Sequence, residues 1–368
     1  MKPAVPQTLP IKNLNWERLL PLIGKANRAL AGYDSALHRL PNSSLLLSPL
    51  TRQEAVLSSR IEGTFATMSE VLQFEAGEIP QQESKRLDIE EIINYQRALK
   101  VATEELRTRP FNLNLLLELH RVLLTSVRGY DKAPGTFRRQ QNYIGSRTAG
   151  VETIRFTPPT WTALKDGLDN WEKYYHSDDL DPIVQLALIH AQFEFLHPFL
   201  DGNGRLGRIL IPVFLFEKRL LSQPTFYLSE YIEKNKDEYC DRLNALGRSR
   251  QSWTLWVEFF LQAVIWQAER NHAKSDRILS LYEDLKQRFI ETTRSPFAIP
   301  LLDAAFQLPI FQASQLTWSM TPPSKPTLMN LLQSLAQQGT LVIVREGLGR
   351  RPYIWALPKL IQIAEGRE

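Results

Sequence analysis

Twelve consecutive residues of this 368-residue chain, from 197 to 208, combine groups that suit phosphate chemistry. They read His-Pro-Phe-Leu-Asp-Gly-Asn-Gly-Arg-Leu-Gly-Arg. Gly202 and Gly204, on either side of Asn203, allow backbone turns that other residues resist and let a ligand approach the main chain. When such a turn opens a helix, its N–H groups form a concave anion site. The pattern therefore predicts a phosphate-binding loop.

Four side chains of the same stretch extend this prediction. Arg205 and Arg208 are three positions apart, so on a helix they share a face and can hold a polyphosphate through paired hydrogen bonds. Asp201 offers the hard oxygen that Mg²⁺ prefers. His197 can accept a proton near neutral pH without being a strong base. Together they favour a reaction at a phosphate group.

Two other interpretations stay open from the residues alone. A loop between helices often contains Gly and Asn, and surface arginines are often only solvated. His197 and Asp201 are also spaced like two metal ligands one helical turn apart. The compact order of base, acid, glycine turn and two arginines favours the phosphate site over both.

The stretch resembles the signature of Fic proteins, His-x-Phe-x-Asp/Glu-Gly-Asn-Gly-Arg-x-x-Arg, and every specified position is present. The resemblance covers residues 45–270 and implies an all-α fold, with a Fic helical core and a β-hairpin flap, and protein adenylyltransferase activity. It makes ATP the AMP donor, Mg²⁺ on Asp201 the cofactor and His197 the catalytic base for a Tyr, Ser or Thr hydroxyl of a target protein or of the chain itself. It assigns the ATP phosphates to Gly202, Asn203, Gly204, Arg205 and Arg208.

A second motif lies upstream, on a helix expected over residues 49–63. Ser58 and Glu62 are four apart and share a face, which alone also fits a solvated polar surface. Ser-Ser-Arg-Ile-Glu-Gly at 58–63 resembles the inhibitory helix of Fic proteins. The resemblance implies that Glu62 pairs with Arg208 and stops ATP from binding productively. In this family such a glutamate can also position water for removal of AMP, so both directions stay open.

Residues 136–158 contain two β-capable runs around a polar turn at 146–150, which predicts a hairpin in an otherwise helical chain. The free edge of a hairpin can pair with an extended peptide. By resemblance this hairpin is the flap, with Tyr143, Ile144 and Gly145, on which the target protein docks. A purely structural hairpin is the alternative.

Residues 226–247 hold aromatic side chains beyond the predicted phosphate site. Tyr231 and Tyr239, with Asn235, can line an adenine pocket, as the matching helix does in Fic proteins, or can simply pack. His120, His190 and Cys240 lie in apolar helical stretches and are interpreted as packing residues rather than catalysts.

Two buried helices are expected to hold the loop rigidly from both sides. The first is capped by Asp181 with Pro182 at its first position, and it ends at His197. The second begins at Arg205, runs to Phe216 and is kinked at Pro212. Further helices are expected over 84–109, 112–127 and 253–270, and residues 1–45 are expected to form an arm with short helical patches.

The C-terminal part changes character. A connector helix over 276–290 is followed by expected helices at 310–319 and 324–338 and a hairpin of 341–345 with 352–355. This order resembles a winged helix-turn-helix domain, in which Arg350 and Arg351 would meet DNA phosphates. The expected reading helix carries only Lys325 as an early cation, a thin basic footprint. DNA binding, including an ATP-sensing regulator, and a protein-contact or homodimer role stay open.

Composition sets wider bounds. The chain is 43% hydrophobic and 23% charged, as ordinary globular proteins are. Its single cysteine excludes an internal disulfide and fits a reducing compartment. Neither a signal pattern nor a membrane-length apolar run is found, so we expect a cytoplasmic protein without a membrane partner. The predicted division is an N-terminal helical region at 1–110, the catalytic core at 111–272 and the connector with the winged domain at 273–368.

Overall fold

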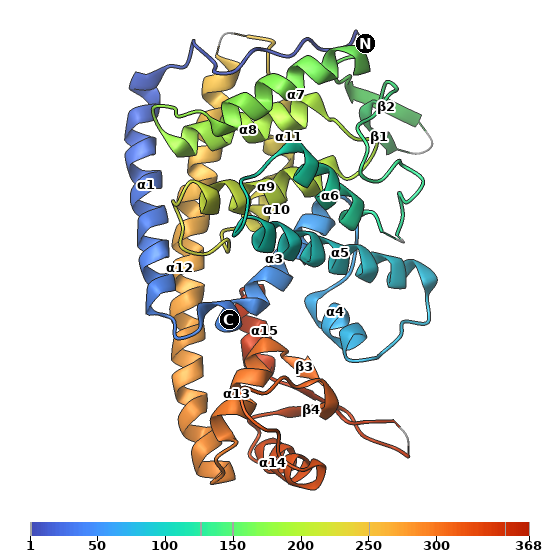
Figure 1. Cartoon of the computed structure of the whole chain (residues 1–368), viewed down its shortest axis with the longest axis vertical. Helices are drawn as coiled ribbons and strands as arrows, with labels where there is room; N and C mark the ends of the chain where they lie inside the picture. The colour runs from blue at the N-terminus through green and yellow to red at the C-terminus, as the bar shows by residue number, and fades with distance from the viewer. Residues whose placement is uncertain (1, 126, 149–150, 250, 350, 368) are drawn as a thin grey trace. The chain divides into compact units, whose positions relative to one another are not determined.

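The computed structural model describes residues 2–125, 127–148, 151–249, 251–349 and 351–367. Helices dominate this part of the chain, with one small hairpin and one small sheet (Figure 1), which confirms the mostly helical expectation. None of the helices in these ranges is both long enough and apolar enough to cross a membrane.

The helices, in chain order, are α1 Trp16–Arg39, α2 Ser43–Leu46, α3 Ser48–Ile61, α4 Met68–Glu75, α5 Glu83–Glu105, α6 Leu113–Leu123, α7 Trp161–His176, α8 Pro182–Leu196, α9 Asn203–Glu217, α10 Ser229–Lys234, α11 Lys236–Asn244, α12 Ser252–Thr293, α13 Ala298–Gln307, the 3₁₀ helix η1 Ala313–Gln315, α14 Lys325–Gln337 and α15 Pro358–Glu365. The strands are β1 Ile144–Thr148, β2 Val151–Phe156, β3 Ile310–Phe311, β4 Val342–Arg345 and β5 Ile354–Ala356.

The chain forms two compact units that alternate along the sequence. One contains residues 1–34, 57–64 and 93–269, and the other contains 35–56, 65–92 and 270–368. The predicted boundaries at 110 and 272 follow sequence features rather than packing, and they stay a prediction.

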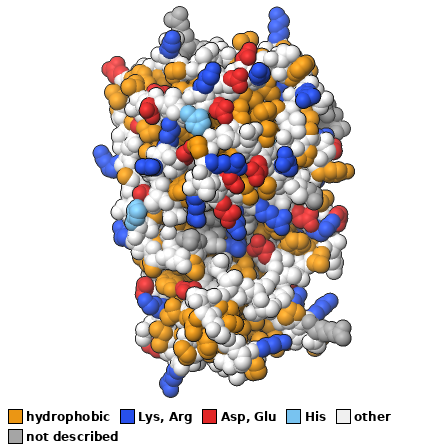
Figure 2. Space-filling model, viewed as in Figure 1, with side chains coloured by type: hydrophobic (Ala, Val, Ile, Leu, Met, Phe, Trp, Pro, Cys, Tyr) orange, Lys and Arg blue, Asp and Glu red, His pale blue; other side chains and the backbone are white. Residues whose placement is uncertain are grey.

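Figure 2 shows cations and anions interspersed over the visible face, in keeping with the formal net charge of +4.

Helices α8 and α9 form the centre of the first unit. Asp181 caps α8, because its side chain accepts hydrogen bonds from the N–H groups of Ile183 and Val184, both at 2.9 Å. All residues from Ile183 to Leu196 are buried, since α8 is apolar on nearly every side. α9 begins at Asn203 rather than at the predicted Arg205, because Gly202 already takes the left-handed turn before the helix, with φ 79°.

The N-terminal arm differs from its prediction. Short helical patches were expected over 1–45, but α1 is a single helix of 24 residues. The buried side chains Leu19, Ala26, Leu30 and Tyr33 recur at helical spacing, so one continuous stripe stabilises it. Before α1, the extended arm lies on α7, where Leu9 exchanges two hydrogen bonds with the Asn170 side chain, at 2.8 and 3.0 Å.

Helix boundaries were wrong at several other places. The expected helices at 253–270 and 276–290 are one helix, α12, because residues 271–275 contain neither Pro nor Gly to break it. α5 ends at Glu105 and α6 at Leu123, each short of the expected end. α7 was not predicted at all, although Leu164, Leu168, Trp171 and Tyr175 form a buried helical stripe.

The flap hairpin is shorter than predicted. β1 and β2 pair antiparallel, with Ile144 opposite Phe156, and a bulge lies between Ile144 and Gly145. Residues 146–148, predicted as part of the turn, are strand, whereas Ala149 and Gly150 lie outside the described residues. The run 135–143 is not strand, because its side chains and backbone bond to the neighbouring loop instead of to a partner strand.

In the C-terminal part, the expected helix at 310–319 was wrong. Ile310 and Phe311 form β3, which pairs antiparallel with β5, and the order of the sheet is β3–β5–β4. This pairing buries Phe311 against a partner far along the chain, which local spacing does not reveal. α14, capped by Ser324, and the hairpin of β4 and β5 agree with the prediction. The winged-helix identity and its partner stay predictions, and Arg350 lies outside the described residues.

Candidate active site

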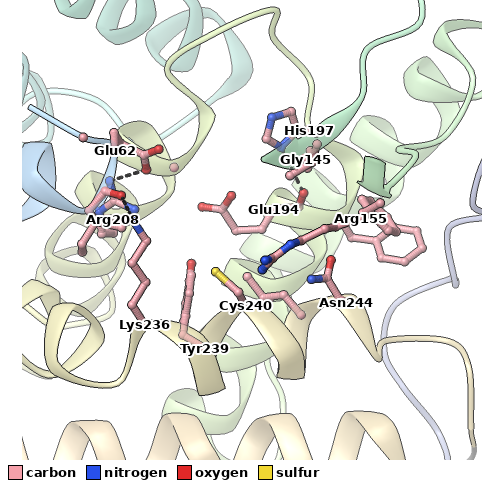
Figure 3. Close-up of a pocket in the computed structure, with 17 residues that line it drawn as sticks. Glu62, Gly145, Arg155, Glu194, His197, Arg208, Lys236, Tyr239, Cys240 and Asn244 are labelled. Atoms are coloured by element: carbon pink, nitrogen blue, oxygen red, sulfur yellow. Dashed lines mark hydrogen bonds and ion pairs between the residues drawn. The ribbon is translucent and has the colours of Figure 1, made fainter. Parts of the chain in front are cut away.

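A cavity of ≈ 420 Å³ lies where the end of α3, the flap, the end of α8, the start of α9 and α11 meet (Figure 3). Its walls come from segments far apart in the sequence but within one compact unit. The lining residues are Ile61, Glu62, Gly63, Ile144, Gly145, Arg155, Phe156, Glu194, Phe195, His197, Gly204, Arg208, Lys236, Tyr239, Cys240, Leu243 and Asn244.

His197 ends α8 in the left-handed conformation, with φ 47° and ψ 61°, which is uncommon for a residue with a Cβ. Its ring is half-buried and lines the cavity, and Nδ1 lies 3.4 Å from the carbonyl oxygen of Glu194. Burial, with a smaller effect of the Arg138 cation, lowers the pKa of His197 to about 4. The imidazole is therefore neutral at pH 7 and can accept a proton.

The loop after His197 is fixed by two side chains. The Asn203 amide donates to the carbonyl oxygen of Phe199 and accepts from its N–H, both at 2.9 Å. His120 accepts from the N–H of Gly135 at 2.8 Å, so its other nitrogen carries the hydrogen and donates to the carbonyl oxygen of Asp201 at 3.0 Å. The predicted phosphate ligand Asn203 thus uses its side chain to hold the loop, and only its main chain, at the start of α9, is left for the predicted anion site.

Arg208 is held by the end of α3. Its Nη2 donates to Glu62 Oε1 at 2.7 Å and to the carbonyl oxygen of Ser58 at 2.9 Å, and its Nε donates to Ser58 Oγ at 2.8 Å. Burial alone would raise the pKa of Glu62, but the Arg208 cation outweighs it and lowers that pKa. A Cβ on Gly204 would overlap Glu62 Oε1, so this carboxylate lies directly on the first turn of α9.

Arg205 and Asp201 form a separate pair near the loop. Arg205 Nη2 lies 3.5 Å from Asp201 Oδ1, and the side chain of Asp201 is 43% exposed. Among the described residues, no group of three or more His, Cys, Asp or Glu side chains could hold a metal. One accessible carboxylate beside the predicted anion site fits Mg²⁺, which usually takes one or two protein carboxylates together with phosphate oxygens.

Of the three residues predicted on the adenine side, Tyr239 lines the cavity. Its hydroxyl lies 2.9 Å from His190 Nε2, and because His190 Nδ1 faces the carbonyl oxygen of Gly207 at 3.1 Å, the tyrosine is the donor. Tyr231 instead packs on the rings of Phe259 and Trp266, and Asn235 bonds to the Tyr231 carbonyl, so packing explains both.

Most of the cavity-lining residues on α11 were not predicted from the sequence. Lys236, Cys240, Leu243 and Asn244 share with Tyr239 the cavity face of α11, and their three- and four-residue spacing was the available signal. Burial raises the pKa of the Cys240 thiol, so it stays protonated, in keeping with its interpretation as a packing residue.

The flap contributes both strands to the cavity. Ile144 and Gly145, two of the three predicted flap residues, line it, whereas Tyr143 is 58% exposed and is not a lining residue. Arg155 and Phe156 of β2 were not predicted, although strand alternation opposite the flap residues would have suggested one of them.

Glu194 is another lining residue that was missed. It is 9% exposed, lies one turn before His197, and its Oε1 has no hydrogen-bond partner among the described residues. Burial raises its pKa to about 8, so it is mostly protonated at pH 7. Gly207 makes room for it, since a Cβ there would overlap Glu194 Oε1.

Comparison with known proteins gives two family matches. The model described as Fic/DOC family N-terminal matches residues 20–104, and the model described as Fic/DOC family matches residues 110–215. The two ranges together cover more than half of the chain.

Curated relatives include proteins named protein adenylyltransferase Fic from Drosophila virilis and Drosophila melanogaster, each 32% identical over 126 residues. These matches span 34% of this chain but only 24% of each relative.

Solved structures with a similar fold include a Fic family protein from Desulfovibrio desulfuricans G20, with TM-score 0.58 and 20% identity, covering 97% of this chain and 98% of that one. A Fic domain containing signaling protein from Bacteroides thetaiotaomicron gives TM-score 0.55 at 19% identity, covering 69% of this chain and 97% of its own. At these identities the likeness establishes the fold.

Proposed function

This chain belongs to the Fic/DOC family, and we propose that it transfers AMP from ATP to the hydroxyl group of a Tyr, Ser or Thr side chain, on a target protein or on itself. The observation that carries the proposal is the neutral imidazole of His197 in one cavity with the first turn of α9 and the Arg208 guanidinium. The names of the curated relatives support the same reaction class.

The reaction follows from these groups. His197 removes the proton from the target hydroxyl, and the oxygen attacks the α-phosphorus of ATP. The bond from that phosphorus to the bridging oxygen breaks, and pyrophosphate leaves with the electron pair. Arg205 and Arg208, with the N–H groups that open α9, stabilise the charge on the leaving group. Asp201 would hold Mg²⁺, which supplies charge neutralisation at the phosphate oxygens when bound.

Glu62 accounts for regulation within this proposal. Its carboxylate contacts Arg208 and lies on the first turn of α9, where an anionic phosphate would bind. A carboxylate in that position competes with the γ-phosphate of ATP both for the cation and for the space. The chain is therefore autoinhibited until the end of α3 moves.

The test is the intact mass of three proteins after incubation with ATP and Mg²⁺: the wild type, Glu62→Gly and His197→Ala. We expect Glu62→Gly to gain one AMP unit faster than the wild type, and His197→Ala to gain none. A charge-assisted contact of ~1.5–3 kcal/mol corresponds to roughly 10- to 150-fold in rate. Because Glu62 is 40% exposed, solvent screening favours the lower end of that range.

Two results would contradict the proposal. Full transfer by a folded His197→Ala protein would exclude the assigned base. No gain in any variant, with ATP shown to bind, would favour removal of AMP, another phosphate donor or ATP sensing instead. A supply of AMP-modified protein would then separate removal from the other two, since only removal would release AMP.

A further inference from the structure

Arg138 is a buried cation outside the predicted motifs. Arg138 is only 3% exposed, and in the sequence it lies between α6 and the flap. All four hydrogen bonds that its guanidinium makes among the described residues go to main-chain carbonyl oxygens, not to a carboxylate. The acceptors are His197 at 2.9 Å, Leu196 at 3.2 Å, Pro159 at 2.6 Å and Gln140 at 3.1 Å.

These four carbonyls belong to two structures. Leu196 and His197 are the last turn of α8 and the residue that carries the imidazole. Gln140 lies shortly before β1 and Pro159 shortly after β2, so they are the two ends of the flap hairpin. The N–H of Arg138 adds a bond to the carbonyl oxygen of Pro198 at 2.9 Å. One side chain thus ties the base of the flap to the backbone of His197.

A buried cation without a counterion is costly, and burial lowers the pKa of Arg138 to about 10, although it stays charged at pH 7. An apolar residue here would leave these carbonyl oxygens without this donor, so the guanidinium serves the groups that it bonds. It stabilises the left-handed backbone of His197, an unfavourable conformation for a residue with a Cβ.

We propose that Arg138 is a positioning residue that couples the flap to His197, so that a hydroxyl docked on the flap is held at the distance from the imidazole that proton transfer requires. This inference rests on the proposed function. Arg138 does not line the cavity, so it acts on the target hydroxyl and the base rather than on ATP. Misplacement of reacting groups by about 1 Å can cost on the order of 100-fold in rate.

Two neighbours provide comparisons, because the side chain of Gln141 bonds only within the flap base, whereas that of Asn142 bonds the loop. Gln141 Nε2 donates to the carbonyl oxygen of Pro158 at 2.9 Å and so holds only the flap base. Asn142, itself at the base of the flap, donates from Nδ2 to the carbonyl oxygens of Phe199 at 3.0 Å and His197 at 3.4 Å, so it forms a second link between the flap and the loop. Gln141→Ala therefore loosens only the flap base and is the matched control, whereas Asn142→Ala removes the smaller link and Arg138→Gln the larger one.

The kinetic test uses Arg138→Gln, Gln141→Ala, Asn142→Ala and the Gln141→Ala/Asn142→Ala pair, all in the active Glu62→Gly background. We expect Arg138→Gln to lower kcat by roughly 10- to 100-fold, more than the pair does, with KM for ATP within about twofold. Arg138→Lys should recover little, because an ammonium group cannot span the four carbonyls. An unchanged kcat in folded Arg138→Gln, or a loss found mainly in KM for ATP, would overturn the inference.

Hydrogen exchange tests the coupling without any activity, so it still decides the matter if AMP transfer is absent. In Arg138→Gln, amides of β1 and β2 and the amides of Leu196, His197 and Phe199 should exchange faster together. In Gln141→Ala only the flap should change, and Asn142→Ala should affect both segments less than Arg138→Gln does. If Arg138→Gln does not fold, Arg138→Lys is measured instead. Faster exchange confined to one of the two segments, or spread evenly over the whole unit, would refute the coupling.

Discussion

At the scale of single residues, the glycines of the 197–208 stretch make room for carboxyl groups. Gly204 leaves space for Glu62, and Gly207 leaves space for Glu194, on one face of α9 beside Arg208. The two carboxyl groups differ in charge because their surroundings differ. The cation of Arg208 keeps Glu62 ionised, whereas burial raises the pKa of Glu194 to about 8. The cavity therefore contains one anion and one neutral acid at pH 7.

The rate of AMP transfer by Glu62→Gly should show no inflection near pH 6.5, where an ordinary histidine titrates. Burial lowers the pKa of His197 to about 4, so the base form is already complete above pH 6. An inflection near pH 8 would come from Glu194. The measurement is the rate between pH 6 and 9 for Glu62→Gly and for Glu62→Gly/Glu194→Gln. A step at pH 6.5 in both would show that His197 is not shielded from water.

At the scale of elements, α3 is held at its C-terminal end by more than Glu62. Lys236 at the start of α11 donates from Nζ to the carbonyl oxygen of Ile61 at 2.5 Å. Figure 3 shows Lys236 rising from α11 toward the pair of Glu62 and Arg208. Arg60 and Glu233 add a half-exposed ion pair at 3.9 Å, which contributes little. The last turn of α3 is thus fastened to both α9 and α11.

Lys236→Met should therefore raise AMP transfer severalfold in the otherwise wild-type chain, because a hydrogen bond from a charged donor is worth up to ~1.5–3 kcal/mol. The same change should give no gain in Glu62→Gly, where the inhibitory contact is already absent. Arg60→Gln is the matched control and should alter the rate by less than about twofold. Initial rates from intact mass would check this. Equal gains in both backgrounds would mean that Lys236 acts on the reaction rather than on α3.

At the scale of the whole molecule, two fully buried histidines link folding to pH. Burial lowers the pKa of His120 to about 4 and that of His190 to about 3. Both rings are neutral when folded, and both accept one hydrogen bond and donate another. In the unfolded chain an imidazole has its ordinary pKa near 6.5. Between about pH 6.5 and 4 the unfolded state binds more protons, so stability rises with pH across this window.

Acidification from pH 7 to pH 5 should consequently lower the free energy of unfolding, by up to ~1 kcal/mol per pH unit for each ring. The thermal unfolding midpoint should fall with it. His190→Gln should lower the midpoint at pH 7 but flatten its dependence on pH. His176→Gln is the control, because His176 is exposed, and it should leave that dependence unchanged. The midpoints would be measured by calorimetry at both pH values. An equal slope in His190→Gln and the wild type would remove His190 from this account.

The sequence by itself determined the loop and the helices that carry it. His197, the glycine turn and both arginines lie within twelve positions, so their grouping needs no long-range contact, and the Asp181 cap with the apolar run of α8 is a local signal. Its resemblance to Fic proteins agrees with the family matches. The paired position of Glu62 followed from that resemblance rather than from spacing.

Contacts between residues far apart in the sequence were decided only by the tertiary structure. Glu62 meets Arg208 across 146 residues, and Arg138 meets the carbonyl oxygen of His197 across 59. β3 forms because Phe311 pairs with Trp355 on β5. Residues of α11 line the cavity because α11 packs near the end of α8. Each of these contacts depends on how buried surfaces pack and where main-chain carbonyls are exposed, and neither property is encoded in a short window of residue types.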